Sequence, residues 1–348
     1  MNQTLNGIRR ILITILVAMG VGALFIVAIG ENPIDAYAAL FRGAFDGELR
    51  LGTTLAGFTP LLLTSIAFAV AAKAGAFNVG VEGEVFLGGI TAAYIGINWT
   101  FLPKPALYVA CFVGAMVVAA AWAFIPAVLR AYYNVNEVCT TILMNTVALY
   151  ITSYLVSGPM SAGTANAQSL PVTVRLYQFM KPSSVNVGIF IAAITVIVII
   201  FMLQKSSWGY KIRTVGLNPT PAAYVGIDSK KVFVGAMMLS GMLGGMAGCI
   251  EVLGVHGYFL NNFATGLGSN GMLAALIVKN NMVSTPFMAF FLAVLKSGAM
   301  GMQQSTGVPK SLVDTITAVF IIIATMETAF QFTKKRKMKT EEKKEDKA

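Results

Sequence analysis

Residues 232–255 read VFVGAMMLSGMLGGMAGCIEVLGV, and this stretch decides the fold class. Its 24 residues carry one charged side chain, Glu251, and exceed the roughly 20 apolar residues that a helix needs to cross a bilayer. The whole chain has the same character, because 56% of its 348 residues are hydrophobic and 11% are charged, against roughly a quarter charged in soluble domains. A soluble domain has too little interior to hide so much apolar surface. The sequence therefore predicts an all-α integral membrane protein.

The same stretch contains two overlapping pairs of glycines with small-xxx-small spacing, Gly241/Gly245 and Gly244/Gly248. Positions without a Cβ let helix backbones approach closely in lipid. We expect these glycines to serve tight packing within the chain. The alternative is a moving seam in a gating helix.

Nine further apolar runs predict spans, which gives about ten transmembrane helices. They are Ile11–Ile29, Thr53–Ala72, Glu84–Asn98, Pro105–Leu129, Val138–Ser157, Val185–Leu203, Gly271–Val278, Thr285–Met302 and Leu312–Phe330. Two of them, Glu84–Asn98 and Gly271–Val278, are short.

Charge placement favours this count and sets an orientation. With Arg9 and Arg10 taken as cytoplasmic, 18 of the 25 Lys and Arg residues fall on the cytoplasmic side, in agreement with the positive-inside rule. An even count also returns the basic C-terminus to that side. We therefore expect a cytoplasmic N-terminus (residues 1–10), a membrane domain (residues 11–331) and a disordered basic cytoplasmic tail (residues 332–348) in a cell-membrane protein. The tail holds eight of the basic residues without an aromatic platform, so nucleic-acid binding is not expected.

Each short span follows a break that contains Gly and Asn, and these breaks lie at Lys73–Gly83 and Gly257–Asn270. Irregular backbone at membrane depth needs protein or a water-filled cavity to satisfy it, and similar breaks in two halves point to a substrate pathway. The breaks open spans three and eight, and this odd offset would give an inverted five-plus-five repeat. Two ordinary loops are the alternative.

A long amphipathic loop, residues 205–231, separates spans six and seven. Asn218 and Pro219 are a helix start signal and Gly226 a stop signal, so a short helix is expected over Thr220–Val225. A helix this short needs a partner surface. It predicts either an interfacial helix on lipid headgroups or a docking knob for another protein that presents Ala222, Ala223 and Tyr224.

Four segments, in matching order, resemble those of sugar- and nucleoside-type ABC importer permeases. They are the loop Gly216–Ile227 (GLNPTPAAYVGI), the break Phe77–Gly88 (FNVGVEGEVFLG), the segment Asn136–Asn145 (NEVCTTILMN), and Thr306–Pro309 (TGVP) with Asp314. The resemblance extends from about Ala36 to Phe330 and is strongest to the larger of two unlike permeases of BmpA-type nucleoside importers.

This resemblance implies partners and a coupling site. It implies a second unlike permease, a cytoplasmic ATPase and an extracytoplasmic substrate-binding lipoprotein. The chain has no G-x-x-x-x-G-K-S/T phosphate loop, so we expect no catalytic residue and no bound cofactor here, with ATP-Mg used by the ATPase. The residues expected to couple to the ATPase are Gly216, Asn218, Pro219, Ala222, Ala223, Tyr224 and Gly226.

A nucleoside is neutral, with a flat base and a hydroxyl-rich ribose, so its path needs amide, hydroxyl and aromatic groups. The two breaks supply such groups at Phe77, Asn78, Asn261, Asn262 and Phe263. Glu82 is included in the path, with an expected structural role as an acceptor of backbone N–H groups in its break.

The remaining ionisable residues and thiols are given local roles. Glu251, Lys296, Asp314 and Glu327 lie near span ends, where snorkelling explains them as well as function does. The single histidine, His256, has no expected metal partner, and Cys111, Cys139 and Cys249 are interpreted as buried structural thiols. Rival functions are an ABC permease for a simple sugar or branched-chain amino acid, and an ion-coupled secondary transporter, which would need a paired buried carboxylate site.

Overall fold

A computed structural model of the chain describes residues 19–309, 311–316 and 318–319. These residues form α-helices, one short π-helix and connecting loops, with three isolated β-bridges and no longer strand among them. The prediction of an all-α fold is thus confirmed for the described residues. The chain divides into two compact units, residues 46–294 and residues 1–45 with 295–348. Each unit has a hydrophobic core of its own.

The larger unit carries most of the helices. Its elements are α3 (Gly47–Lys73), α4 (Val81–Asn98), α5 (Lys104–Tyr133), α6 (Glu137–Ser157), α7 (Gly188–Lys205), α8 (Ser207–Leu217), α9 (Pro219–Tyr224), α10 (Ser229–Ile250), the π-helix η1 (Glu251–His256), α11 (Leu267–Ile277) and the first part of α12 (Thr285–Thr306).

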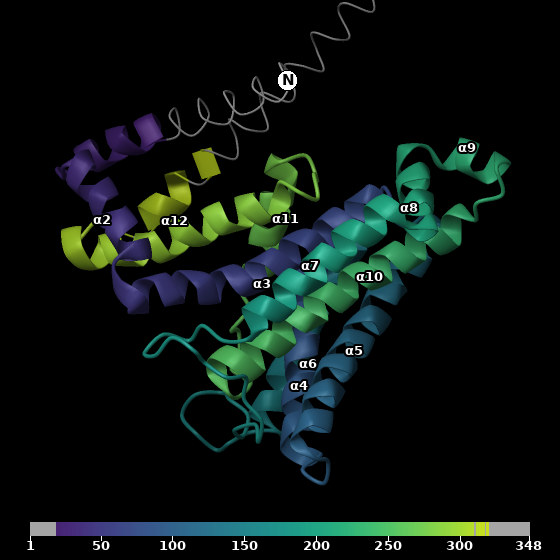
Figure 1. Cartoon of the computed structure of the whole chain (residues 1–348), viewed down its shortest axis with the longest axis horizontal. Helices are drawn as coiled ribbons and strands as arrows, with labels where there is room; N and C mark the ends of the chain where they lie inside the picture. Colours follow the sequence, from purple (N-terminus) through teal and green to yellow (C-terminus); the bar gives the residue numbers. More distant parts are fainter. Residues whose placement is uncertain (1–18, 310, 317, 320–348) are drawn as a thin grey trace, which may run out of the picture. The chain divides into compact units, whose positions relative to one another are not determined.

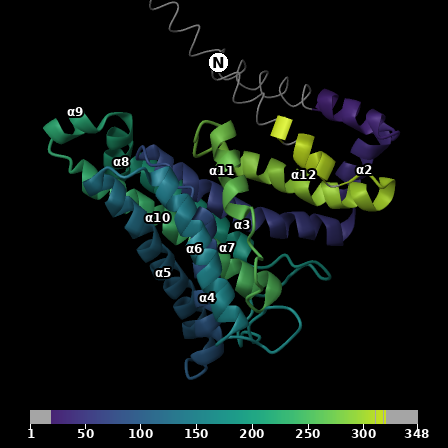
Figure 2. The same ribbon diagram turned by 180° about the vertical axis from the view of Figure 1, so that it is seen from behind.

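Helix α10 is the centre of this unit and packs against α3, α4 and α5, which run alongside it in Figures 1 and 2. Its glycines lie in these contacts. Gly241 and Gly245 face α5, and Gly244 and Gly248 face α4. A Cβ on Gly248 would stand 2.7 Å from the backbone nitrogen of Gly89, so this approach requires glycine. The small-xxx-small spacing therefore seats α10 between two neighbours.

Four polar side chains begin helices in this unit by accepting a backbone N–H of the first turn. Asn136 caps α6 through the Val138 N–H at 2.9 Å, and Ser206 caps α8 at 3.0 Å. Asn218 caps α9 at 3.1 Å, and Asp228 caps α10 at 3.1 Å. The positions of α8, α9 and α10 thus follow from single residues in the loop, and Figure 1 shows α8 and α9 gathered where α10 begins.

The smaller unit contains an element that the sequence did not predict. A helix over Met19–Ala28 is followed by α2 (Pro33–Phe45), and the two are bent by 116°. We expected one span that ends at Ile29 and no helix after it. The start signal was present, because Asn32 Oδ1 accepts the Ile34 N–H at 3.0 Å with a proline between them.

The described residues contain six helices long and apolar enough to cross a membrane, or seven if the bent pair is one span. The prediction of ten spans and an inverted repeat is not confirmed by this count. The two runs predicted to be short are α4, with 18 residues, and α11, with 11. Residues 11–18 of the first span, most of Leu312–Phe330, Glu327, and both predicted terminal segments lie outside the described residues.

Candidate functional site

The first break is held by a buried polar network around Asn78, which is 1% exposed. Its Nδ2 donates to Glu84 Oε1 and to Ser240 Oγ, both at 2.9 Å, and its Oδ1 accepts the Gly80 N–H at 2.9 Å. The other Glu84 oxygen, Oε2, is buried and has no hydrogen-bond partner among the described residues. Since its whole side chain is used inside the protein, Asn78 does not line an open surface, in contrast to our expectation.

Helix α6 clamps the same break through Asn145. Asn145 Oδ1 accepts the Gly83 N–H at 2.8 Å, and its Nδ2 donates to the Val79 carbonyl at 2.9 Å. One amide thus satisfies a donor and an acceptor of the irregular backbone, as such backbone requires at membrane depth. Asn145 is the last residue of the segment Asn136–Asn145, and this clamping role was not predicted for it.

The second break is held by the loop that follows α6. Ser169 Oγ accepts the Phe259 N–H at 2.9 Å, and the Asn261 N–H donates to the Ala167 carbonyl at 2.9 Å. The Asn261 side chain accepts from Ser153 Oγ at 2.7 Å. Its two polar attachments therefore fix Asn261 in the loop framework.

Glu82 joins the two breaks, and its hydrogen-bond partners in the second break lie 184 and 187 residues away in sequence. Its Oε1 accepts the backbone N–H of Gly266 and its Oε2 accepts the Ser269 hydroxyl, both at 3.1 Å. Glu82 therefore accepts a backbone N–H, as expected, but the donor belongs to the second break. Phe263 reinforces the junction, because its ring meets that of Phe86 edge to face at 5.7 Å.

An accessible polar face surrounds this junction. Ser269, Asn262 and Thr265 are exposed, and Phe263 and Glu82 are half-buried. Asn262 adopts φ +60°, in the left-handed region that asparagine tolerates better than most residues. Phe77 lies apart from this group, half-buried against the ring of Phe68 at 5.0 Å. All six predicted path residues are thus placed, and three of them, Asn262, Glu82 and Phe263, reach the face.

The π-helix η1 carries a buried acid, Glu251, for which snorkelling was one of two expected explanations. Glu251 is 8% exposed, and its Oε2 lies 3.6 Å from His256 Nε2. Snorkelling does not explain a carboxylate held inside the protein beside an imidazole. The described residues contain no group of three His, Cys, Asp or Glu side chains able to hold a metal ion. Asp314, in the smaller unit, is exposed.

Helices α8 and α9 form a knob where α10 begins, and α8 is an element that we did not predict. The short helix α9 has the expected cap, and Gly226 after it adopts φ +79°. Ala222 is fully buried, so the prediction that it is presented is wrong; it occupies the side of α9 that packs on α8 and α10. The exposed apolar surface comes from Leu217 and Tyr224, each 88% exposed, with Ala223 beside them.

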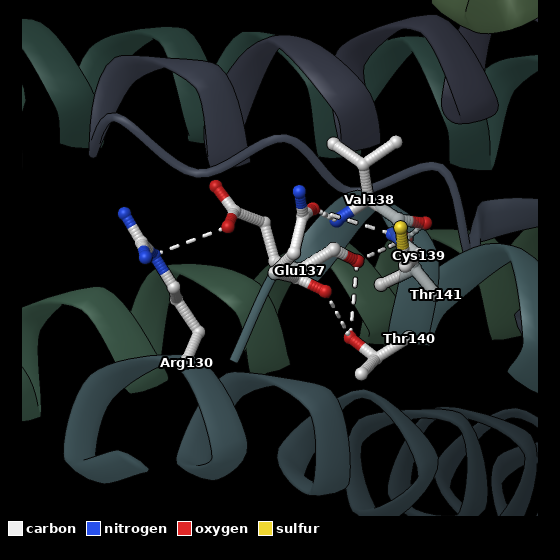
Figure 3. A network of polar contacts seen from close by, with 7 residues as sticks. Arg130, Glu137, Val138, Cys139, Thr140 and Thr141 are labelled. Atoms are coloured by element: carbon white, nitrogen blue, oxygen red, sulfur yellow. Dashed lines mark hydrogen bonds and ion pairs between the residues drawn. The ribbon is translucent and has the colours of Figure 1, made fainter. Parts of the chain in front are cut away.

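The start of α6 is a second polar cluster, drawn in Figure 3. Arg130 Nε lies 3.1 Å from Glu137 Oε2, and this ion pair joins the end of α5 to the start of α6 (Figure 3). Cys139 follows in the first turn and is exposed, whereas Cys111 and Cys249 are buried. The prediction of a buried thiol is wrong for Cys139, because most of α6 is not covered by the other helices that the structure describes.

Comparison with known proteins adds to this geometry. Residues 50–325 match the family model described as branched-chain amino acid transport system / permease component. The chain is 33% identical to the guanosine ABC transporter permease protein NupP of Bacillus subtilis, over 92% of this chain and 94% of that protein. It is 32% identical to the glucose ABC transporter permease protein TsgB13 of Haloferax volcanii, over 89% and 85%. It is 30% identical to the nucleoside ABC transporter permease protein NupB of Lactococcus lactis, over 92% and 91%. A second guanosine permease of B. subtilis, NupQ, is 23% identical over 70% of this chain and 79% of that protein.

Proposed function

The chain belongs to the family of branched-chain amino acid transport system permease components, and we propose that it forms half of a nucleoside path in an ABC importer. The observation that carries the proposal is the near full-length similarity to two permeases named for nucleoside cargo. They are NupP, named for guanosine, and NupB, named for nucleosides. As a permease component the chain is a multi-pass membrane protein and a transport subunit. ATP-Mg would be bound and hydrolysed by a separate ATPase, with no cofactor on this chain.

We assign the cargo path to the accessible face around Glu82. This face offers a hydroxyl at Ser269, an amide at Asn262 and a ring at Phe263, the groups that a ribose and a flat base can use. None of these three side chains carries a fixed charge, which suits weak contacts with a neutral solute in transit. Glu82 holds the face together through its bonds to the second break.

We assign coupling to the knob of α8 and α9. Exposed apolar side chains at Leu217 and Tyr224 favour a protein partner, because single-turn helices need a surface to pack on. The knob is tied to α10, since Ser229 Oγ donates to the Pro219 carbonyl at 3.2 Å and the Ile227 N–H donates to the Ala222 carbonyl at 3.0 Å. Movement of the ATPase would thus reach α10 directly.

The partners proposed are a second unlike permease, a cytoplasmic ATPase and an extracytoplasmic lipoprotein that binds the cargo. The similarity to two different B. subtilis guanosine permeases, NupP and NupQ, supports the first of these. Ten spans in an inverted five-plus-five arrangement, both termini in the cytoplasm and residence in the cell membrane complete the proposal. The basic tail and the positive-inside distribution support this orientation.

The test is ATP-dependent uptake of labelled guanosine by the four-part complex in proteoliposomes. We expect uptake that excess unlabelled nucleoside blocks and excess ribose or glucose does not. Competition by glucose with no guanosine uptake would reassign the cargo to a sugar, as the name of TsgB13 indicates for that relative. Uptake that needs an ion gradient and no ATPase would refute the ABC class itself.

A further inference from the structure

A groove of about 570 Å³ runs between α5 and α10 on the larger unit, and none of the proposed cargo-path residues lines it. One wall is a stripe on α5 at four-residue spacing, formed by Phe124, Val128 and Tyr132. The other wall is on α10, where Val234 and Met238 lie on one face with Gly235 between them. Residues four apart share a helix face, so each wall is continuous along its helix.

Gly235, in the α10 wall, is the point at which the groove approaches α8. A Cβ on Gly235 would stand 3.1 Å from Cζ2 of Trp208, so the indole of α8 packs directly against this wall. From Phe124 to Tyr132 the apolar wall extends roughly 12 Å along α5, at 1.5 Å per residue. That length is close to the roughly 15 Å of hydrocarbon in one leaflet. An acyl chain of one leaflet therefore matches the groove in depth and in polarity.

The groove is polar, aromatic and basic at the end where α5 finishes and α10 begins. Tyr132 and Tyr133 are 51% and 72% exposed, as expected of aromatic residues at a lipid–water boundary. The Lys230 ammonium lies 5.0 Å from the Tyr132 ring centroid, and the Lys231 ammonium lies 3.3 Å from Asp228. Among the described residues, the two lysines and the one aspartate at this rim leave a net charge of +1. The nearby Arg130 is engaged by Glu137.

We propose that this groove is a binding site for one anionic phospholipid, with an acyl chain between α5 and α10 and the phosphate at Lys230 and Lys231. An apolar trough that ends in tyrosines and an excess cation matches both parts of such a molecule. A protein partner would use the trough without a charge requirement, and a free phosphate would use the lysines without the trough. One uncompensated lysine near a membrane surface favours an anionic headgroup over a zwitterionic one by about fivefold.

The test uses the full chain in the assembled complex, with Trp99→Phe and Trp122→Phe so that Trp208 is the remaining tryptophan of this chain, and the signal of the same complex with Trp208→Phe is subtracted as the contribution of the other subunits. Phosphatidylglycerol or phosphatidylcholine with brominated acyl chains is titrated into nanodiscs of unbrominated phosphatidylcholine, and quenching of Trp208 fluorescence is measured. We expect quenching by both lipids, with phosphatidylglycerol favoured about fivefold. Lys230→Gln with Lys231→Gln should remove the preference, and Val128→Phe should reduce quenching by both lipids.

The matched control is Lys205→Gln with Lys211→Gln, which removes the same charge from the same loop but outside the groove. This control should keep the preference for phosphatidylglycerol. Equal quenching by the two lipids in the parent complex would overturn the proposal, and so would a preference that the control abolishes as fully as the rim variant does. Quenching in the isolated chain that vanishes in the complex would instead assign the groove to a protein partner and overturn the lipid site. None of these results depends on which cargo is transported.

Discussion

Replacing Glu82 tests whether the two breaks are held together by its carboxylate. Glu82→Ala removes two hydrogen bonds, from the Gly266 N–H and the Ser269 hydroxyl, each 3.1 Å long. Hydrogen bonds to a charged group contribute about 1.5–3 kcal/mol each. The side chain is half-buried, so the lower value is appropriate and the pair should contribute about 3 kcal/mol to holding the second break in place.

The assay is hydrogen exchange of the peptide that contains Gly266, measured on the intact complex. If local opening controls exchange, a loss of about 3 kcal/mol should raise the exchange rate of this amide roughly 100-fold. Ser269→Ala, which removes one of the two bonds, should raise it roughly tenfold. Glu48→Gln, an exposed carboxylate at the start of α3, is the matched control and should leave the rate unchanged. A rate in Glu82→Ala within threefold of the parent would refute the junction.

Three further predictions concern the knob, the packing of α10 and its cap. Ala223→Arg should leave membrane insertion intact and reduce uptake at least tenfold while ATP hydrolysis continues; unchanged uptake would contradict coupling through α9. Gly248→Leu should destabilise the protein by about 1–3 kcal/mol, because its Cβ would stand 2.7 Å from a backbone nitrogen of α4. Gly57→Leu on α3 is the control and should be tolerated in thermal unfolding, because a Cβ there would meet no atom of the described residues within 4 Å. The backbone N–H of Lys231 lowers the pKa of Asp228 below its ordinary 3.8. The cap should therefore stabilise α10 fully above pH 3.8 and be lost as the pH falls through the lowered pKa. Asp228→Asn should abolish this pH dependence in hydrogen-exchange measurements of the first turn of α10.

The elements that could be predicted from sequence are those set by neighbouring residues. The short helix α9 depends on Asn218 before it and Gly226 after it, and both signals are readable in one pass along the chain. Long apolar runs such as α5 and α7 need only length and composition. Helix α2 was not predicted because its start signal, Asn32 before Pro33, comes three residues after Ile29, the predicted end of the first span.

The features that could not be predicted depend on partners far away in sequence. Ala222 and Ala223 are adjacent and chemically identical, yet one is buried against α8 and α10 and the other is exposed. Asn78 and Asn262 were both predicted to contact cargo. The side chain of Asn78 instead hydrogen-bonds Ser240 and Glu84 inside the protein, and these partners could not be read from the sequence. Both breaks were recognised from their glycines and asparagines, and their junction through Glu82 became visible only in three dimensions.

The continuity of α10 with η1 has a mechanical consequence. The combined helix covers Ser229–His256, 28 residues, which corresponds to a rod of roughly 40 Å. The knob is fastened to its first turn, and the second break starts at Gly257, directly after its last. A tilt of about 5° imposed at the knob would displace the far tip by roughly 3–4 Å, about the height of one strand residue or the thickness of a base. The length of this rod alone is enough to convert a small rotation at the knob into a displacement of molecular size at the second break.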